Sequence, residues 1–144
     1  MILTSSSDEK LERAKELGAH PVINYARDPE WNVAVKAFTN GAGVDHVLDV
    51  AGGDSVARSL DALTVGGNIV IVGLLQSPTF TLEILPYILK QATIHTLSVG
   101  SREAFEKMNR ALEMNKIRPV IDQEYALTAV PQAFAATASP SFQP

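Results

Sequence analysis

The chain opens with the sequence MILTSSSDEK at residues 1–10, and this stretch decides the fold. Met1–Thr4 is short and apolar, which predicts a β-strand. The serines that follow favour a turn, and Ser6 and Glu9 have the spacing of a capping box, the signal at which a helix begins. The stretch therefore predicts a strand, a turn and a helix in direct succession.

After residue 10, apolar strand-like segments keep alternating with helix-like segments. Gly66–Gly67 reads as a turn, and Ser101 is placed to cap a strong helix. The alternation is typical of an α/β fold with a doubly wound parallel sheet. It predicts a Rossmann-like domain over residues 1–117 and a strand, a helix and a frayed tail over residues 118–144. The further expected strands are Pro21–Asn24, Val44–Val50, Asn68–Leu74, Ala92–Val99 and Arg118–Asp122, and the last expected helix is Thr128–Thr137.

Residues 1–10 have the form of the second strand-turn-helix of such a sheet, whose first strand lies in the middle and carries a glycine-rich loop. We therefore expect a doubly wound sheet that lacks its first strand and that loop. Met1–Thr4 should then pair beside Pro21–Asn24 or Asp45–Val50. Three outcomes are open at this point: the two halves of the sheet pair directly, another chain fills the gap, or the segment is marginally stable.

Composition excludes several function classes. The chain has 144 residues, a net charge of −4 and no cysteine. The acidic balance offers no basic field for nucleic acid or an anionic membrane. Without cysteine there is no thiol catalysis and no cysteine-ligated zinc, and the three histidines are too scattered for a metal site. No segment approaches the ~20 apolar residues of a membrane span and no leader is visible, so we expect a cytoplasmic protein.

Six stretches occur in a distinctive order and spacing. They are TSSSDEKLERAKELGA (4–19), VINY (22–25), GVDHVLDV (43–50), GGNIVIVG (66–73), VGSREAFEKMN (99–109) and RPVI (118–121). Together they resemble the medium-chain dehydrogenase/reductase superfamily, the group of the zinc alcohol dehydrogenases and quinone reductases. The resemblance covers about residues 1–137 and does not reach the family's catalytic domain.

The resemblance implies the cofactor-binding portion of an oxidoreductase that uses NADP(H), with NAD(H) as the alternative. Hydride transfer to or from a carbonyl, an alcohol or an activated double bond is the parent reaction. We expect no catalytic and no metal-binding residue in this segment, and no turnover by it alone. The implied cofactor contacts are Ser5, Ser6, Lys10, Tyr25, Val50, Gly52, Gly73, Leu74, Val99, Gly100 and Ser101.

Some of these residues also have a plainer interpretation. NAD-preferring domains usually carry an acidic residue where this chain has serines. Hydroxyl groups together with Lys10 suit a 2′-phosphate instead. The alternative interpretation of the same residues is a helix cap beside a solvated lysine. Gly52 could serve a tight turn, and Ser101 a helix start. Asp45 and Asp49 are four apart on one strand and should share a face. We expect them to be a turn residue and a ligand-side or solvent-facing carboxylate rather than an acid/base pair.

The strand at residues 92–99 is an expected sheet edge, and the resemblance implies a homodimer through it. Two other interpretations of the chain stay open. It could be a non-catalytic assembly or nucleotide-binding module that docks on a full-length relative. It could also be a different nucleotide domain of the methyltransferase type, although the missing acidic residue after the first strand argues against this.

Overall fold

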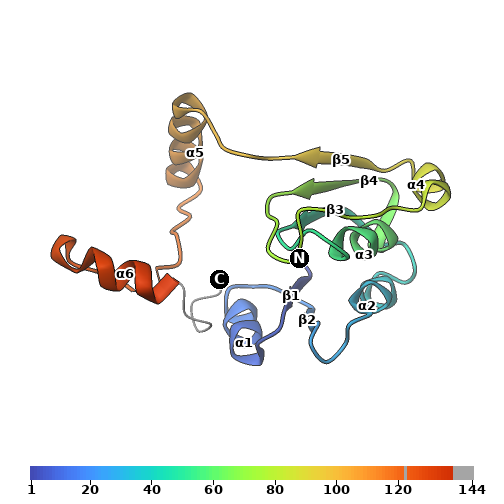
Figure 1. Cartoon of the computed structure of the whole chain (residues 1–144), viewed down its shortest axis with the longest axis horizontal. Coiled ribbons are helices and arrows are strands. Elements are labelled where there is room, and N and C mark those ends of the chain that lie inside the picture. The colour runs from blue at the N-terminus through green and yellow to red at the C-terminus, as the bar shows by residue number, and fades with distance from the viewer. Residues whose placement is uncertain (122, 138–144) are drawn as a thin grey trace. The chain divides into compact units, whose positions relative to one another are not determined.

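The computed structural model describes residues 1–121 and 123–137. They belong to two compact units, Met1–Ser98 and Val99–Pro144. The first unit alternates strands and helices as expected (Figure 1). Its elements are β1 (Leu3–Ser5), α1 (Asp8–Glu16), β2 (Val22–Asn24), α2 (Trp31–Phe38), β3 (Val44–Asp49), α3 (Ser55–Ala62), β4 (Leu63–Ile71), α4 (Ile84–Lys90) and β5 (Thr93–Thr96). The second unit contains α5 (Arg102–Met114), a 3-10 turn (Leu127–Ala129) and α6 (Val130–Thr137). The boundary expected after residue 117 stays a prediction.

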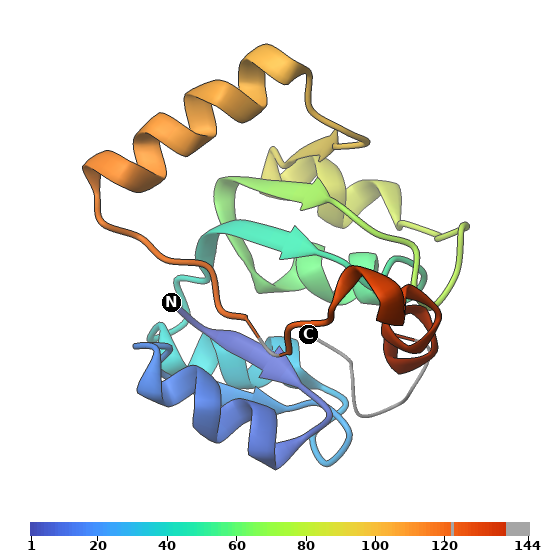
Figure 2. The same cartoon turned by 90° about the vertical axis from the view of Figure 1, so that its left-hand side faces the viewer.

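All the paired strands of the first unit are parallel, which confirms the α/β class. The strands form a two-stranded sheet, β1-β2, and a three-stranded sheet, β3-β4-β5 (Figure 2). Leu3 pairs with Val22 and Ser5 with Asn24, so the opening strand lies beside its expected neighbour. Within residues 1–121 and 123–137, no ladder of hydrogen bonds joins β1 to β3. The two halves of the sheet therefore do not pair directly.

The main core lies between the three-stranded sheet and helix α3. Val56 and Leu60 of α3 are buried against Leu63, Ile69 and Ile71 of β4. Helix α4 also packs against β4 and adds the half-buried side chain of Tyr87 to the same cluster. Each fully buried side chain of this size contributes about 1.5–3 kcal/mol, so this cluster is the principal source of stability for the β3–β5 half.

A second cluster connects the two sheets. Ile23 of β2 and Val35 of α2 are buried together with Ala62, the last residue of α3. Helices α2 and α3 pack side by side, and each covers its own sheet from the same side (Figure 1). Both sheets are thus held in one unit by helix packing rather than by a continuous ladder.

Polar contacts from α2 and α4 meet at the C-terminal end of α3. Asp61 forms an ion pair with Lys36 and accepts a 2.8 Å hydrogen bond from the amide of Asn32, both on α2. The ammonium of Lys90 on α4 donates to the main-chain oxygens of Asp61 and Leu63. Lys90 therefore satisfies carbonyls that the end of a helix leaves without partners.

The helix starts follow their capping signals with small shifts. Helix α1 is capped by Ser7, whose Oγ accepts from the N–H of Lys10 at 3.4 Å, so the expected capping box at Ser6 is wrong by one residue. Helix α5 is capped by Ser101 as expected, since its Oγ accepts from the N–H of Ala104 at 3.1 Å. The first cap sets the direction in which α1 leaves the sheet.

The expected turn at Gly66–Gly67 is wrong, because both glycines lie inside β4. Val44 pairs with Leu63 but His46 pairs with Asn68, so the register between β3 and β4 shifts there. The chain bulges over the intervening β4 residues, and Gly66 has a φ of 79° that favours glycine.

The C-terminal expectations are met in part. Residues 118–121 form no strand, and Asp122 lies outside the described residues. The last helix appears as α6 after a short 3-10 turn. The tail expected to fray, residues 138–144, also lies outside the described residues. No helix in the described part of the chain has the length and apolar character to cross a membrane.

Candidate functional site

The carboxyl ends of β1 and β2 lie next to each other, because the strands are parallel and Ser5 pairs with Asn24. The N–H of Tyr25 donates to the main-chain oxygen of Ser5 at 3.0 Å and continues this pairing past the strand ends. We call residues 5–10 and 24–27 the β1–β2 edge. Ligands of open α/β sheets bind at this end of the strands.

The structure brings together at the β1–β2 edge four of the residues implicated by sequence: Ser5, Ser6, Lys10 and Tyr25. The Ser5 hydroxyl accepts from the N–H of Ser7 at 3.3 Å and shapes the turn. The Ser6 side chain is exposed, and Tyr25 is 39% exposed. Hydroxyls that accept from the backbone still have a hydrogen to donate, so this turn offers donors to an anion.

Two cations stand at the same edge. Lys10 is half-buried and forms no ion pair with any described residue. Arg27 forms an ion pair with Asp8. The amide of Asn24 donates to the same carboxylate oxygen of Asp8 at 2.7 Å, while its own oxygen accepts from the N–H of Ala26 at 3.0 Å. Arg27 is not among the residues that the sequence implicated, although its place just after a predicted strand was a usable signal.

The carboxyl end of β3 is organised by Asp49, which is 3% exposed. One of its oxygens accepts from the N–H groups of Ala51 and Gly52 at 3.0 and 2.9 Å, and the other accepts from the Ser59 hydroxyl at 2.8 Å. The expectation of a ligand-side or solvent-facing carboxylate is wrong for Asp49, because its carboxylate is buried and fully engaged. Asp45 lies on the same strand but is exposed, so the two carboxylates differ in burial.

The loops that follow β3 and β4 pack directly on each other. An added Cβ at Gly52 would lie 2.7 Å from the main-chain oxygen of Ser77, and one at Gly73 would lie 2.4 Å from that of Val50. Glycine is therefore required at both positions by contact between the loops, which supports the tight-turn interpretation of Gly52. Val50 and Leu74 are 54% and 62% exposed at the same end of the strands. The cofactor contacts implied for these four residues stay predictions.

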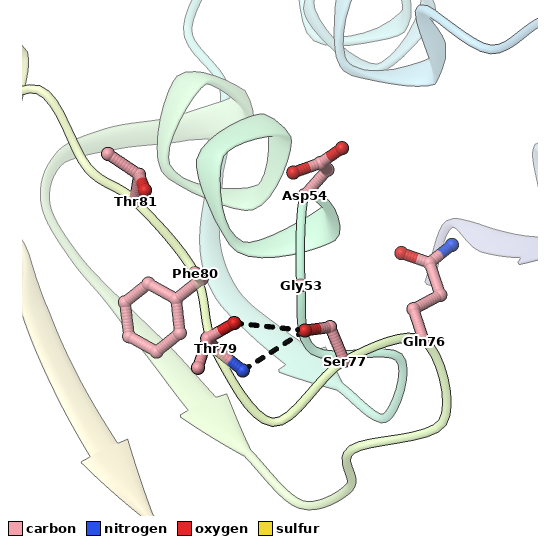
Figure 3. A pocket seen from close by; sticks show the side chains of 7 residues that line it. All are labelled: Gly53, Asp54, Gln76, Ser77, Thr79, Phe80 and Thr81. Atoms are coloured by element: carbon pink, nitrogen blue, oxygen red, sulfur yellow. Dashed lines mark hydrogen bonds between the residues drawn. The ribbon is translucent and has the colours of Figure 1, made fainter.

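A pocket of about 310 Å³ lies beside these loops (Figure 3). Ser77 organises its wall, since its Oγ accepts from the N–H of Thr79 at 3.1 Å and lies 3.2 Å from the Thr79 hydroxyl. Asp54 is the single ionisable side chain in the lining. The pocket thus contains no acid/base pair, and none of the implied cofactor contacts lines it.

Val99, Gly100 and Ser101 belong to the second unit. Ser101 is the N-cap of α5, which confirms the helix-start interpretation of this residue. Its contact with a cofactor stays a prediction, as do those of its two neighbours.

The donors present fit a phosphate better than a metal. In the described part of the chain, no group of three His, Cys, Asp or Glu side chains could hold a metal ion. The β1–β2 edge instead combines hydroxyls, an ammonium and a guanidinium, the groups that bind phosphate by charge-assisted hydrogen bonds. The chemistry of this edge therefore favours an anionic ligand over a metal ion.

Comparison with known proteins gives consistent matches. The profile of a family described as zinc-binding dehydrogenase matches residues 1–114. A zinc-type alcohol dehydrogenase-like protein of Schizosaccharomyces pombe is 36% identical over 136 residues, which are 92% of this chain and 39% of that protein. A structure assigned as an alcohol dehydrogenase from Sinorhizobium meliloti 1021 superposes with a TM-score of 0.86 at 39% identity, covering 94% of this chain and 39% of the other. An NAD-dependent alcohol dehydrogenase gives a TM-score of 0.71 at 33% identity, covering 83% and 34%. The chain thus spans well under half the length of these proteins.

Proposed function

Because this chain belongs to the zinc-binding dehydrogenase family, whose profile matches residues 1–114, we propose that it is the cofactor-binding portion of an NADP(H)-dependent oxidoreductase. The resemblance to the medium-chain dehydrogenase/reductase superfamily indicated by the sequence motifs is confirmed. The parent activity is of the alcohol dehydrogenase or quinone reductase type. The resemblance implies that the substrate is selected by the family's catalytic domain, which these residues do not match.

The single observation that carries the proposal is the chemistry of the β1–β2 edge. Strand β1 ends in Ser5 rather than in an acidic residue, and the half-buried Lys10 has no ion-pair partner among the described residues. An acidic residue at this place would accept the ribose 2′-hydroxyl of NAD(H), whereas hydroxyls and a cation suit a 2′-phosphate. Ser5, Ser6, Lys10 and Tyr25 are the proposed contacts of the adenosine 2′-phosphate of NADP(H).

The nicotinamide half of the cofactor would lie past the carboxyl ends of β3 and β4. The proposed contacts are Val50, Gly52, Gly73 and Leu74 from these loops, together with Val99, Gly100 and Ser101. The cofactor supplies the hydride chemistry when it is bound, and the protein residues bind and orient it. Asp49 contributes indirectly, because its three hydrogen bonds fix the loop that carries Val50 and Gly52.

The residues present do not fit the zinc that the family's description names. The chain has no cysteine, and the described residues offer no cluster of metal ligands. We therefore assign no step to zinc in this segment. The expected behaviour of the 144-residue chain alone is cofactor binding without turnover.

The proposal extends to assembly and location. Strand β5 is an edge of its sheet, paired with β4 on one side. An edge strand presents unpaired backbone groups that can add the same strand of a second copy. We propose a homodimer through residues 92–99 and a cytoplasmic location.

The second candidate is a non-catalytic module that docks on a full-length relative. It is favoured by the separation of β1 from β3, since both strands have an edge without a partner among the described residues. Light scattering on a mixture of the chain with a full-length relative distinguishes the two candidate functions by the masses of the species present. Hetero-oligomers would favour the module, and unmixed species would favour the first proposal.

The direct test is a titration of the full chain with NADPH, NADH and S-adenosylmethionine, with thermal unfolding as the readout. A ligand that binds only the folded chain stabilises it by RT ln(1 + [L]/Kd), so at equal concentration the tighter ligand raises the unfolding temperature more. The proposal predicts a larger shift with NADPH than with NADH and none with S-adenosylmethionine. Equal shifts with both nicotinamide nucleotides would contradict the NADP preference. No shift with either would contradict cofactor binding by this chain.

A further inference from the structure

Arg27 is a cation at the β1–β2 edge that is bound by a carboxylate from the neighbouring helix start. Its guanidinium pairs with Asp8, the first residue of α1. The same oxygen of Asp8 accepts the amide of Asn24, the last residue of β2. Asn24 pairs with Ser5 across the two strands, so the carboxylate is held beside the strand ends.

This ion pair is exposed to solvent. The side chains of Arg27 and Asp8 are 70% and 59% exposed. Exposed ion pairs contribute little to stability, because water screens the charges and holding two long side chains costs entropy. Arg27 can therefore leave Asp8 for a stronger anion at small cost. A phosphate dianion is such an anion, since guanidinium binds it through two parallel hydrogen bonds.

We propose that Arg27 is a specificity-determining residue that binds the 2′-phosphate of the adenosine ribose, and that Asp8 is its counterion when no phosphate is bound. The inference rests on the proposed cofactor function and adds two residues to it. Lys10 supplies one positive charge to the phosphate, and Arg27 supplies the planar, bidentate contact. Asp8 then keeps only its hydrogen bond from the amide of Asn24.

The exchange gives Asp8 a defined effect on affinity. Its carboxylate competes with the phosphate for Arg27 and also repels the phosphate charge. Replacing Asp8 by asparagine should strengthen binding of a 2′-phosphate, and the part due to competition should vanish when Arg27 is also replaced. A nucleotide without the 2′-phosphate should respond to neither change.

The test is isothermal titration calorimetry of the full chain with 2′,5′-ADP and 5′-AMP, which differ only in the 2′-phosphate. The variants are Asp8→Asn, Arg27→Gln, Arg27→Lys and the double variant Asp8→Asn/Arg27→Gln. The matched controls are Glu12→Gln and Lys15→Gln, which remove the same charges from another exposed ion pair of α1. Circular dichroism of each variant checks that it is folded.

Loss of a bidentate phosphate contact should weaken 2′,5′-ADP about tenfold in Arg27→Gln, with a smaller loss in Arg27→Lys and less than about twofold change for 5′-AMP. Asp8→Asn should strengthen binding of 2′,5′-ADP several-fold, and adding it to Arg27→Gln should give a smaller gain, because only the repulsion is then removed. If both nucleotides bind and the variants behave like the controls, the inference is overturned while the proposed function survives. If neither nucleotide binds the wild-type chain, both are overturned.

Discussion

The hydroxyl of Ser59 in the middle of α3 donates a 2.8 Å hydrogen bond to the carboxylate of Asp49 at the end of β3. Both side chains are buried, at 1% and 3% exposure. The other carboxylate oxygen receives the N–H groups of Ala51 and Gly52. One buried carboxylate thus joins a helix, a strand end and the loop proposed to carry cofactor contacts.

Asp49→Ala should be strongly destabilising, because it leaves two backbone N–H groups and the Ser59 hydroxyl without their acceptor. We expect a loss of about 2–4 kcal/mol in the free energy of unfolding, measured by urea denaturation. Asp45→Ala is the matched control on the same strand; its carboxylate is exposed, and its effect should stay within about 0.5 kcal/mol. Equal effects of the two variants would refute the structural role of Asp49.

Gly73→Ala should destabilise the folded chain, because the added methyl group has no space. An added Cβ lies 2.4 Å from the Val50 oxygen, so the loops after β3 and β4 must separate. We expect a loss of about 1–3 kcal/mol in the free energy of unfolding. Gly100→Ala is the control, because its Cβ would meet nothing closer than 3.7 Å and neither glycine has a positive φ. A Gly73→Ala variant as stable as the wild type would show that the loops are not in contact.

The ion pair between Asp61 and Lys36 predicts an acid-sensitive contribution to stability. Burial raises the pKa of Asp61, but the hydrogen bonds from Lys36 and Asn32, together with the positive charges of Lys36 and Lys90, outweigh it. They hold the pKa below its ordinary value of 3.8. As the pH falls, the unfolded chain therefore takes up this proton first. The contribution is fully present above the ordinary pKa and is lost as the pH drops through the folded-state pKa.

Urea unfolding midpoints measured from about pH 6 down to about pH 3 check this dependence. Asp61→Asn should flatten the acid end of the profile. Asp45→Asn removes an exposed carboxylate that forms no ion pair with a described residue, and it should leave the profile nearly unchanged. An Asp61→Asn profile that falls as steeply as that of the wild type would rule out this role.

The proposed dimer can be tested through the backbone of β5. The N–H of Leu97 donates to Ile71 on β4, so by the alternation of a strand the N–H of Thr96 faces away from β4. Thr96→Pro removes this outward donor and should convert a dimer into a monomer by light scattering. Thr96→Ala keeps the N–H and should remain dimeric. A dimer that persists in the proline variant would mean that the copies meet elsewhere.

The sequence predicted the order and type of the first-unit elements well, because each depends on local signals. The apolar pattern of Val44–Asp49 and the cap at Ser101 are local features, and both appear where expected. The capping box at Ser6 was wrong because three consecutive serines can each act as a cap, and the choice depends on which helix phase buries Leu11 and Ala14.

The remaining differences depend on contacts between distant residues. Gly66–Gly67 is not a turn, because β4 begins directly after α3 and includes both glycines. They lie where the register between β3 and β4 shifts. Asp49 is buried because it accepts from Ala51, Gly52 and Ser59, and strand alternation alone does not reveal these contacts. Arg27 was missed because its partner, Asp8, comes near only through the pairing of Ser5 with Asn24.

The most direct test of the central claim is a backbone amide NMR titration of the labelled full chain with 2′,5′-ADP. The account predicts that the largest shifts fall on residues 5–10 and 24–27, at the carboxyl ends of β1 and β2. If these amides stay unchanged while others shift, such as those lining the pocket around Ser77, then the phosphate is bound elsewhere and the assignment of this edge is contradicted.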